Sequence, residues 1–220
     1  SRKALFTIGE RVASASSVSG NSTLVSSDSL IFQGKFFSGK WTGDVVAFGF
    51  NADGTLSSTE TWKASEQLPA AASRNIYTWN GTAATAFSGS TIASLVGSID
   101  LLNYIRGDTS EEEGNGGAFR TRSSRLGDIV NSSPVFVGKP ANRGYERYAW
   151  AGASSYQAFR EAKAARKQMV YVGANDGMLH AFEAKTGKET FAYIPSELLS
   201  SLKNLADPKY VHRFYVDGEV

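Results

Sequence analysis

Three short apolar runs near the end of the chain give the clearest hydrophobic pattern. They occupy residues 169–172, 179–182 and 191–194, and Asn175-Asp176-Gly177 and Lys185-Thr186-Gly187 separate them. Asn, Asp and Gly tolerate the backbone angles of tight turns, so both breaks predict hairpins and the segment predicts a three-stranded β-meander. The runs are apolar at successive positions, not at alternate ones. This pattern suits a sheet packed on both faces, as in the blades of a propeller.

The first half of the chain also reads as strands. Residues 30–37 and 44–50 have strand-like patterns, residues 55–62 predict a weaker strand after the turn at Asn51-Ala52-Asp53-Gly54, and residues 75–80 predict a further one. Residues 13–29 are rich in serine, which suits an edge strand or a surface loop.

Three segments have helical periodicity and are expected as insertions between strands. Residues 91–105 place apolar side chains at helical spacing despite Gly97, and residues 154–167 predict a second helix. Residues 196–206 predict a third, with Ser196 as a candidate N-cap and Pro208 beyond its end. The first of these helices should pack against the body of the sheets.

Composition narrows the class of protein. The 220 residues are 41% hydrophobic and 12% aromatic, which is ample for a packed core. The net charge is only +2, with eight basic and eight acidic side chains in residues 1–110 and fifteen and thirteen in the rest, so no nucleic-acid partner is indicated. The absence of cysteine excludes disulfides, thiol catalysis and thiolate metal sites. No apolar run approaches the roughly 20 residues of a membrane span, and no membrane span is expected.

Several segments carry a family resemblance. The run from Ala181 to Phe191 resembles the blade repeat of quinoprotein-type propellers, Ala-x-Asp-x-x-Thr-Gly-x-x-x-Trp, with Glu183 and Phe191 in place of the usual Asp and Trp. Together with residues 122–138 and 210–218, this region resembles the C-terminal domain of the PilY/PilC family of type IV pilus tip-associated proteins. Residues 36–47, 51–54 and 73–78 add to the match.

The resemblance implies a mainly β fold, part of a quinoprotein-like β-propeller with helical insertions. Residues 1–220 are then expected to be a fragment of one propeller domain. Its expected parts are a first blade-like unit at 30–80, a helix and polar loop at 90–122, and a second blade with the start of a third at 123–220. The family carries a calcium loop of the Asp-x-Asp-x-Asp type, and no residues here match it, so calcium is expected beyond Val220 and no cofactor within the chain.

The same resemblance implies a function. It indicates a non-enzymatic factor and tip-associated adhesin for pilus assembly, control of retraction and surface attachment. The expected partners are pilin subunits, other pilus assembly proteins and a host-cell receptor. The expected location is extracytoplasmic, at the pilus tip, cell surface or outer membrane of a Gram-negative bacterium. Two alternatives remain open: a dehydrogenase that uses pyrroloquinoline quinone, and an outer-membrane assembly scaffold.

One short motif could bind a receptor. Arg106-Gly107-Asp108 is a tripeptide that integrins recognise on exposed loops, and it follows a predicted helix. The alternative is that it ends that helix, with Gly107 as the C-terminal cap and Asp108 as a turn acceptor, and we favour this interpretation.

Other polar residues indicate structure more than chemistry. Asn51-Ala52-Asp53-Gly54 resembles half a calcium loop, but the closing acidic ligand is missing, because Trp62 stands at that position. His180 and His212 have no third metal ligand at suitable spacing and are interpreted as hydrogen-bonded structural histidines. Two basic groups are interpreted as solvated faces, because few aromatic residues are interleaved with them: Arg120, Arg122 and Arg125, and the run Arg160, Lys163, Arg166 and Lys167. No nucleophile elbow or phosphate loop occurs, so no catalytic residue is assigned.

Overall fold

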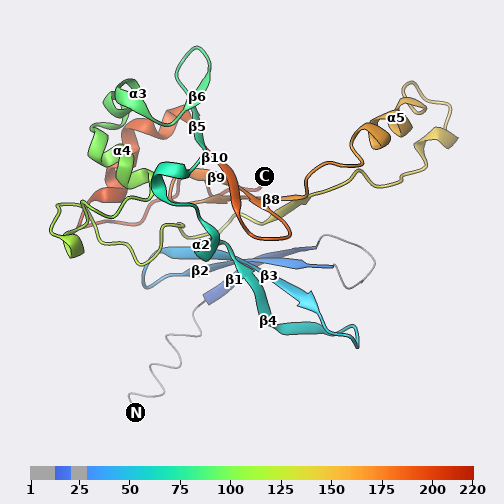
Figure 1. Cartoon of the computed structure of the whole chain (residues 1–220), viewed down its shortest axis with the longest axis horizontal. Helices are drawn as coiled ribbons and strands as arrows, with labels where there is room; N and C mark the ends of the chain where they lie inside the picture. The colour runs from blue at the N-terminus through green and yellow to red at the C-terminus, as the bar shows by residue number, and fades with distance from the viewer. Residues whose placement is uncertain (1–12, 21–28) are drawn as a thin grey trace.

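The computed structural model describes residues 13–20 and 29–220, which form two β-sheets and a set of helices (Figure 1). The first sheet is an antiparallel meander in the order β1-β2-β3-β4. Its strands are β1 (Ala13–Gly20), β2 (Ile31–Phe37), β3 (Thr42–Phe50) and β4 (Leu56–Lys63). The strand predicted at 30–37 therefore exists, and the serine-rich segment supplies an edge strand. The expectation for residues 21–28 lies outside the described residues.

The second sheet contains the meander predicted from the three apolar runs. Its strands are β5 (Ile76–Trp79), β6 (Ala84–Ala86), β7 (Val135–Val137), β8 (Met169–Ala174), β9 (Met178–Glu183) and β10 (Glu189–Ile194). The spatial order is β6-β5-β10-β9-β8-β7. Strands β7 to β10 pair antiparallel, so this part is a second four-stranded meander. The fold is mainly β, and neither sheet closes on itself within the described residues.

Strand β5 differs from the expectation. Residues 75–80 were expected in the first blade-like unit at 30–80, but β5 lies in the second sheet and pairs parallel with β10. Helix α2 (Ala64–Gln67) and the 3₁₀ turn η1 (Ala71–Ser73) carry the chain from β4 to β5. This connection takes the chain from the first sheet to the second, and local sequence does not specify which strand of the second sheet becomes the partner of β5.

The helix predicted at 91–105 is two helices, α3 (Gly89–Val96) and α4 (Ile99–Arg106). Gly97 ends α3 with φ of 138°, and the Ser98 hydroxyl then caps α4 by accepting a hydrogen bond from the Leu101 amide at 3.0 Å. The prediction gave too little weight to Gly97 as a helix-ending residue, because the apolar residues keep their helical spacing on both sides of it.

The other two predicted helices are also modified. Helix α5 (Ser155–Ala162) is shorter than expected and buries none of its residues. The segment η4 (Ser196–Ala206) is a 3₁₀ helix, and no side-chain cap is formed at its start, where Pro195 precedes it. Short 3₁₀ turns also form at η2 (Glu113–Asn115) and η3 (Tyr145–Arg147).

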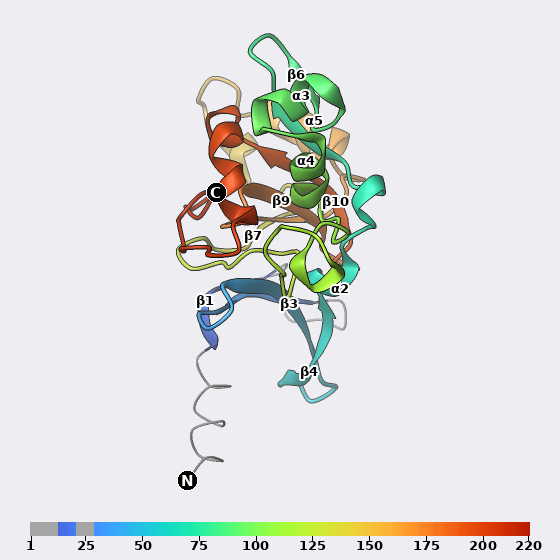
Figure 2. The same cartoon turned by 90° about the vertical axis from the view of Figure 1, so that its left-hand side faces the viewer.

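Two hydrophobic clusters make the fold a three-layer structure. One cluster lies between the two sheets and includes Phe32, Trp62 and Phe182. The other lies between the second sheet and the helices α3, α4 and η4 (Figure 2). Both faces of β8 to β10 are therefore covered, as the unbroken apolar runs predicted. Within the described part of the chain, no helix is long and apolar enough to cross a membrane.

The loop at residues 126–128 holds the two sheets together at one end. Gly43 of β3 donates its amide to the Leu126 carbonyl at 3.5 Å, and Thr42 forms a β-bridge with Gly127. On the other side, the Gly127 amide donates to the Asp176 carboxylate at 3.0 Å. A Cβ on Gly127 would lie 2.3 Å from the Asp176 backbone nitrogen, so the backbones approach too closely for any side chain.

We expect Gly127→Ala to lower the free energy of unfolding by roughly 1 to 3 kcal/mol, because the loop must move away from the β8–β9 turn. Gly39→Ala is the matched control, since a Cβ at Gly39 meets nothing within 4 Å. Urea unfolding of both variants measures the difference. Equal stabilities would show that the close approach at Gly127 is not required.

Candidate functional site: a polar cleft and a buried ion network

A polar cleft opens where the ends of the two sheets meet the helices. Its volume is about 390 Å³. The turn after β2 contributes Lys40 and Trp41, and the β8–β9 turn contributes Asn175 and Asp176. The remaining wall comes largely from the extended segment 120–128, with α4 and the end of η4 behind it. Segments far apart in the sequence therefore converge on this cleft.

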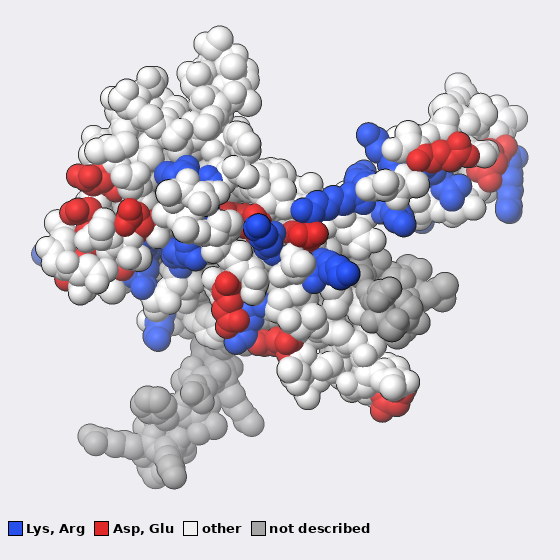
Figure 3. Space-filling model, viewed as in Figure 1, with Lys and Arg blue, Asp and Glu red and all other residues white. Residues whose placement is uncertain are grey.

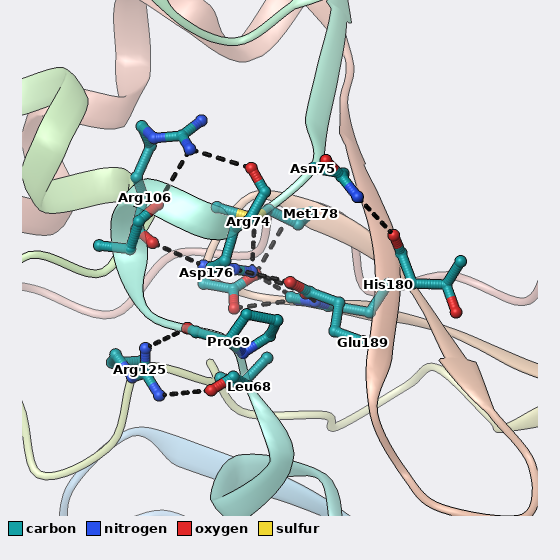
Figure 4. A network of polar contacts seen from close by, with 12 residues as sticks. Leu68, Pro69, Arg74, Asn75, Arg106, Arg125, Asp176, Met178, His180 and Glu189 are labelled. Carbon is teal, nitrogen blue, oxygen red and sulfur yellow. Dashed lines mark hydrogen bonds and ion pairs between the residues drawn. The ribbon is translucent and has the colours of Figure 1, made fainter.

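A buried network of four charged side chains lies behind the cleft (Figure 4). Arg74, immediately before β5, donates two hydrogen bonds of 2.7 Å to the Glu189 carboxylate at the start of β10. The His180 imidazole of β9 contacts Glu189 at 2.8 Å through Nδ1 and Asp176 at 3.1 Å through Nε2. The side chains of Arg74 and His180 are fully buried, Glu189 is almost so, and Asp176 is 15% exposed. Charges therefore alternate in sign along the network.

The network sets the protonation of its members. Burial disfavours a charged His180, but the Asp176 and Glu189 carboxylates outweigh this effect and raise the pKa of His180 to about 9. Burial likewise opposes ionisation of Glu189, but Arg74 and His180 lower its pKa to about 2. The pKa of Asp176 is also lowered, because its attraction to His180 exceeds the cost of burial. His180, Glu189 and Asp176 are therefore charged at neutral pH.

We expect the stability of the domain to depend on pH with a definite sign. The raised pKa of His180 contributes stability that is complete below pH 6.5 and is lost as the pH rises through about 9. The lowered pKa of Glu189 contributes stability that is complete above pH 4.5 and is lost as the pH falls through about 2. Urea unfolding between pH 3 and pH 9.5 should therefore give maximal stability near pH 4.5 to 6.5. His180→Asn should remove the decline in stability above pH 6.5. If the variant still shows the same decline, other titrating groups cause it.

The interpretation of Arg120, Arg122 and Arg125 as a solvated face is wrong. Each guanidinium donates hydrogen bonds to the protein backbone. Arg120 donates to the Leu205 carbonyl, and Arg122 donates to the carbonyls of Tyr104 and Asp108. Arg125 donates to the carbonyls of Leu68 and Pro69. The Arg122 guanidinium also forms a 2.7 Å ion pair with Glu112 and lies 3.6 Å from the centre of the Tyr104 ring. The three side chains join the loop to the helices and to the segment before β5.

The two histidines are hydrogen-bonded, as predicted. Besides the bonds of His180, the His212 Nε2 lies 2.8 Å from the Asp128 carboxylate, which also accepts a 2.7 Å hydrogen bond from Asn175. The Trp41 indole stacks on the His212 ring with centres 3.8 Å apart. A further carboxylate near the end of the chain, Asp217, accepts three backbone hydrogen bonds from residues 130–132. These contacts hold residues 212–217 against the segment 128–132.

The tripeptide Arg106-Gly107-Asp108 ends helix α4. Gly107 is buried and adopts φ of 109°, the left-handed conformation that a C-terminal cap glycine takes. The Arg106 guanidinium donates to the carbonyls of Phe87, Ala71 and Arg74 at 2.9 Å each. Asp108 accepts a 2.8 Å hydrogen bond from the Ser110 amide. The arginine therefore binds the fold itself, which supports the helix-cap interpretation.

The loop that resembles half a calcium site is a turn. Asp53 accepts hydrogen bonds from the amide and hydroxyl of Thr55, and Asn51 contacts the same hydroxyl. In the part of the chain that the structure describes, no group of three or more His, Asp or Glu side chains is arranged to hold a metal ion.

Sequence reasoning missed the ion network. The available signals were three charged or ionisable residues, Arg74, His180 and Glu189, inside or next to apolar strands, where such side chains are rarely buried without partners. Their pairing depends on β5 lying beside β10, which the sequence did not predict. The network can orient Asp176 at the cleft, and its members bond to one another at distances typical of structural ion pairs.

Comparisons with known proteins identify relatives over almost the whole chain. Residues 126–220 match the family described as the PilY1 beta-propeller domain. A Xylella fastidiosa (strain Temecula1) protein named type IV pilus biogenesis factor PilY1 homolog is 40% identical over 217 residues, covering 97% of this chain and 18% of that protein. The type IV pilus biogenesis factor PilY1 of Pseudomonas aeruginosa strain PAK is 37% identical over 215 residues, covering 85% of this chain and 18% of that protein.

The corresponding protein of P. aeruginosa strain UCBPP-PA14 is 33% identical over 244 residues, which cover 98% of this chain and 21% of that protein. The chain therefore spans about a fifth of the length of the curated relatives that it matches. No solved structure matches it.

Proposed function

We propose that this chain, which belongs to the family of the type IV pilus biogenesis factor PilY1, supports pilus biogenesis as a rigid folded platform and acts by contact, not by catalysis. The observation that carries the proposal is the similarity to PilY1 proteins over 97% of the chain.

The architecture supports a platform. The second sheet is packed on both faces, and the loop at 126–128 joins it to the first sheet by direct backbone contact. Arg74, His180 and Glu189 are buried and paired with one another, and Arg106 and Arg125 hold backbone carbonyls across the fold. These charged side chains therefore hold strands, helices and loops of the fold together.

The proposed partners are pilin subunits and other pilus assembly proteins, at an extracytoplasmic site such as the pilus tip or cell surface. Control of retraction and surface attachment, including attachment to a host-cell receptor, belongs to the same proposal. Calcium binding by a part of the protein beyond Val220 also remains a proposal. Each depends on the transfer of function from the relatives.

Deletion of the codons for residues 29–220 from the parent gene tests the proposal. We expect loss of surface pili while pilin continues to be made, with pili restored by the intact gene. Electron microscopy and immunoblotting of sheared surface pilin measure this. Normal numbers of pili on cells that lack these residues would contradict the proposed function.

The quinoprotein-like repeat has a structural explanation. In the turn of the repeat, Gly187 packs directly on the Trp62 indole, where a Cβ would lie 2.5 Å from a ring carbon, and the indole nitrogen donates to the Ala184 carbonyl at 3.1 Å. The repeat thus joins the second sheet to β4. Purified protein given pyrroloquinoline quinone, calcium and primary alcohols should reduce a redox dye no faster than a heat-denatured control. Faster reduction would favour the dehydrogenase alternative.

A further inference from the structure

An arm projects from the second sheet between β7 and β8. Residues 138–168 leave the sheet, form η3 and α5, and return, and Figure 1 shows them extending well away from both sheets. Arg166 closes the base of the arm by donating to the Gly138 carbonyl. Helix α5 has no buried residue, so the arm contributes nothing to either hydrophobic cluster.

The tip of the arm is built from aromatic rings that pack on one another. The Tyr145 ring centre lies 5.4 Å from that of Trp150 and 4.8 Å from that of Tyr156, and the Tyr148 ring centre lies 5.1 Å from that of Trp150. The Tyr156 hydroxyl donates to the Ala141 carbonyl at 2.8 Å, which joins the two sides of the arm. The tip is therefore ordered by its own contacts, without help from the sheets.

Two rings of the tip, and a third on the neighbouring helix α5, are exposed to solvent. Tyr148 is 61% exposed, Trp150 is 55% exposed and Phe159 is 43% exposed. A hollow of about 330 Å³, lined by Tyr145, Trp150, Tyr156 and Phe159 among others, opens between the rings and α5. A preformed aromatic hollow on a projecting element has the composition of an interaction hot spot, where Trp, Tyr and Arg are enriched.

Charge identifies the kind of partner. Residues 139–167 carry seven basic side chains and two acidic ones, Glu146 and Glu161, although the whole chain has a net charge of only +2. Arg143 and Arg147 flank the aromatic tip and are exposed. Figure 3 shows Lys and Arg along the arm from its base to its tip. Such a surface attracts an acidic partner and repels a basic one.

We propose that the arm is a docking element for an acidic protein surface, with an apolar side chain of the partner inserted into the aromatic hollow. A protein is favoured over a nucleic acid because the packed rings are inclined to one another by 49° to 73° and do not form the parallel platforms on which successive bases stack. A protein is favoured over a lipid bilayer because Glu146 and Glu161 lie on the same arm as the exposed rings. The proposal does not depend on the proposed function.

Fluorescence anisotropy with the whole 220-residue chain and short labelled peptides tests the proposal. The probes are acidic peptides with one central Leu or Phe, the same peptides with Ser at that place, and lysine-rich peptides with the apolar residue retained. We expect salt-sensitive binding of the acidic apolar peptides alone. Trp150→Ser, and separately the pair Arg143→Glu and Arg147→Glu, should each weaken that binding at least about tenfold.

Trp79→Ser is the matched control, because Trp79 is an exposed tryptophan of β5, 43% exposed and outside the arm. It should leave peptide binding unchanged. The unfolding midpoints of the arm variants should also be unchanged, since the tip does not contact the core. The proposal is overturned if no acidic apolar peptide binds or if the arm variants bind it as well as the original chain. Arm-dependent binding to anionic lipid vesicles or single-stranded DNA in place of the peptides would overturn it too.

Discussion

Replacing Glu189 by alanine is expected to lower the free energy of unfolding by roughly 3 to 5 kcal/mol. Glu189 is the carboxylate between the two buried cations Arg74 and His180, and it accepts hydrogen bonds of 2.7 Å and 2.8 Å from them. Without it, Arg74 retains the Met178 sulfur and the Arg106 carbonyl as partners but loses its ion pair, and Asp176 is the one carboxylate left in the network for two cations. An uncompensated buried charge costs more than the ion pair itself contributes.

Urea unfolding at pH 6 measures this change. Lys167→Ala is the control, because the ion pair between Lys167 and Glu183 spans 3.4 Å with Lys167 54% exposed, and we expect a cost of at most about 1 kcal/mol. The double variant Arg74→Met with Glu189→Leu should cost less than the sum of the two single changes, since it removes both charges. Additive costs would show that the two side chains do not act as a pair.

Replacing Phe182 by aspartate is expected to unfold the domain. Phe182 is fully buried between the two sheets, and its ring stacks on the His180 ring with centres 5.5 Å apart. The loss of the ring alone costs roughly 3 to 5 kcal/mol, and the buried carboxylate adds a further penalty. The total is comparable with the whole stability of a typical domain, about 5 to 15 kcal/mol.

Circular dichroism and thermal unfolding measure this outcome. Leu56→Asp is the control, because Leu56 also lies in a strand but is 49% exposed, and it should leave the fold intact. A cooperative thermal transition near the original temperature in the Phe182→Asp protein would contradict the packing described for the two sheets.

The local features of the fold were predictable because their causes are local. The β8–β10 meander follows from three apolar runs and two turns that contain glycine, and the structure confirms all three strands. The positive φ of Gly107 also followed from sequence, since a glycine after the basic end of a helical pattern is a common C-terminal cap.

The features that were missed depend on contacts between distant segments. The parallel pairing of β5 with β10 joins residues more than 100 positions apart, and no local pattern specifies it. Arg120, Arg122 and Arg125 were misinterpreted for the same reason, because their carbonyl partners become available only when the loop at 120–125 lies against α4 and the segment before β5. The division of the predicted helix at Gly97 had a visible signal, the glycine followed by Ser98, which was outweighed by the continuous apolar spacing.

The central claim, that the chain serves pilus biogenesis as a folded platform, is tested most directly by counting surface pili on cells that carry Phe182→Asp in the parent gene. The account predicts that these cells lose surface pili, whereas cells carrying the Leu56→Asp control keep them. Normal pili on Phe182→Asp cells, with the same substitution shown to unfold the purified domain, would contradict it.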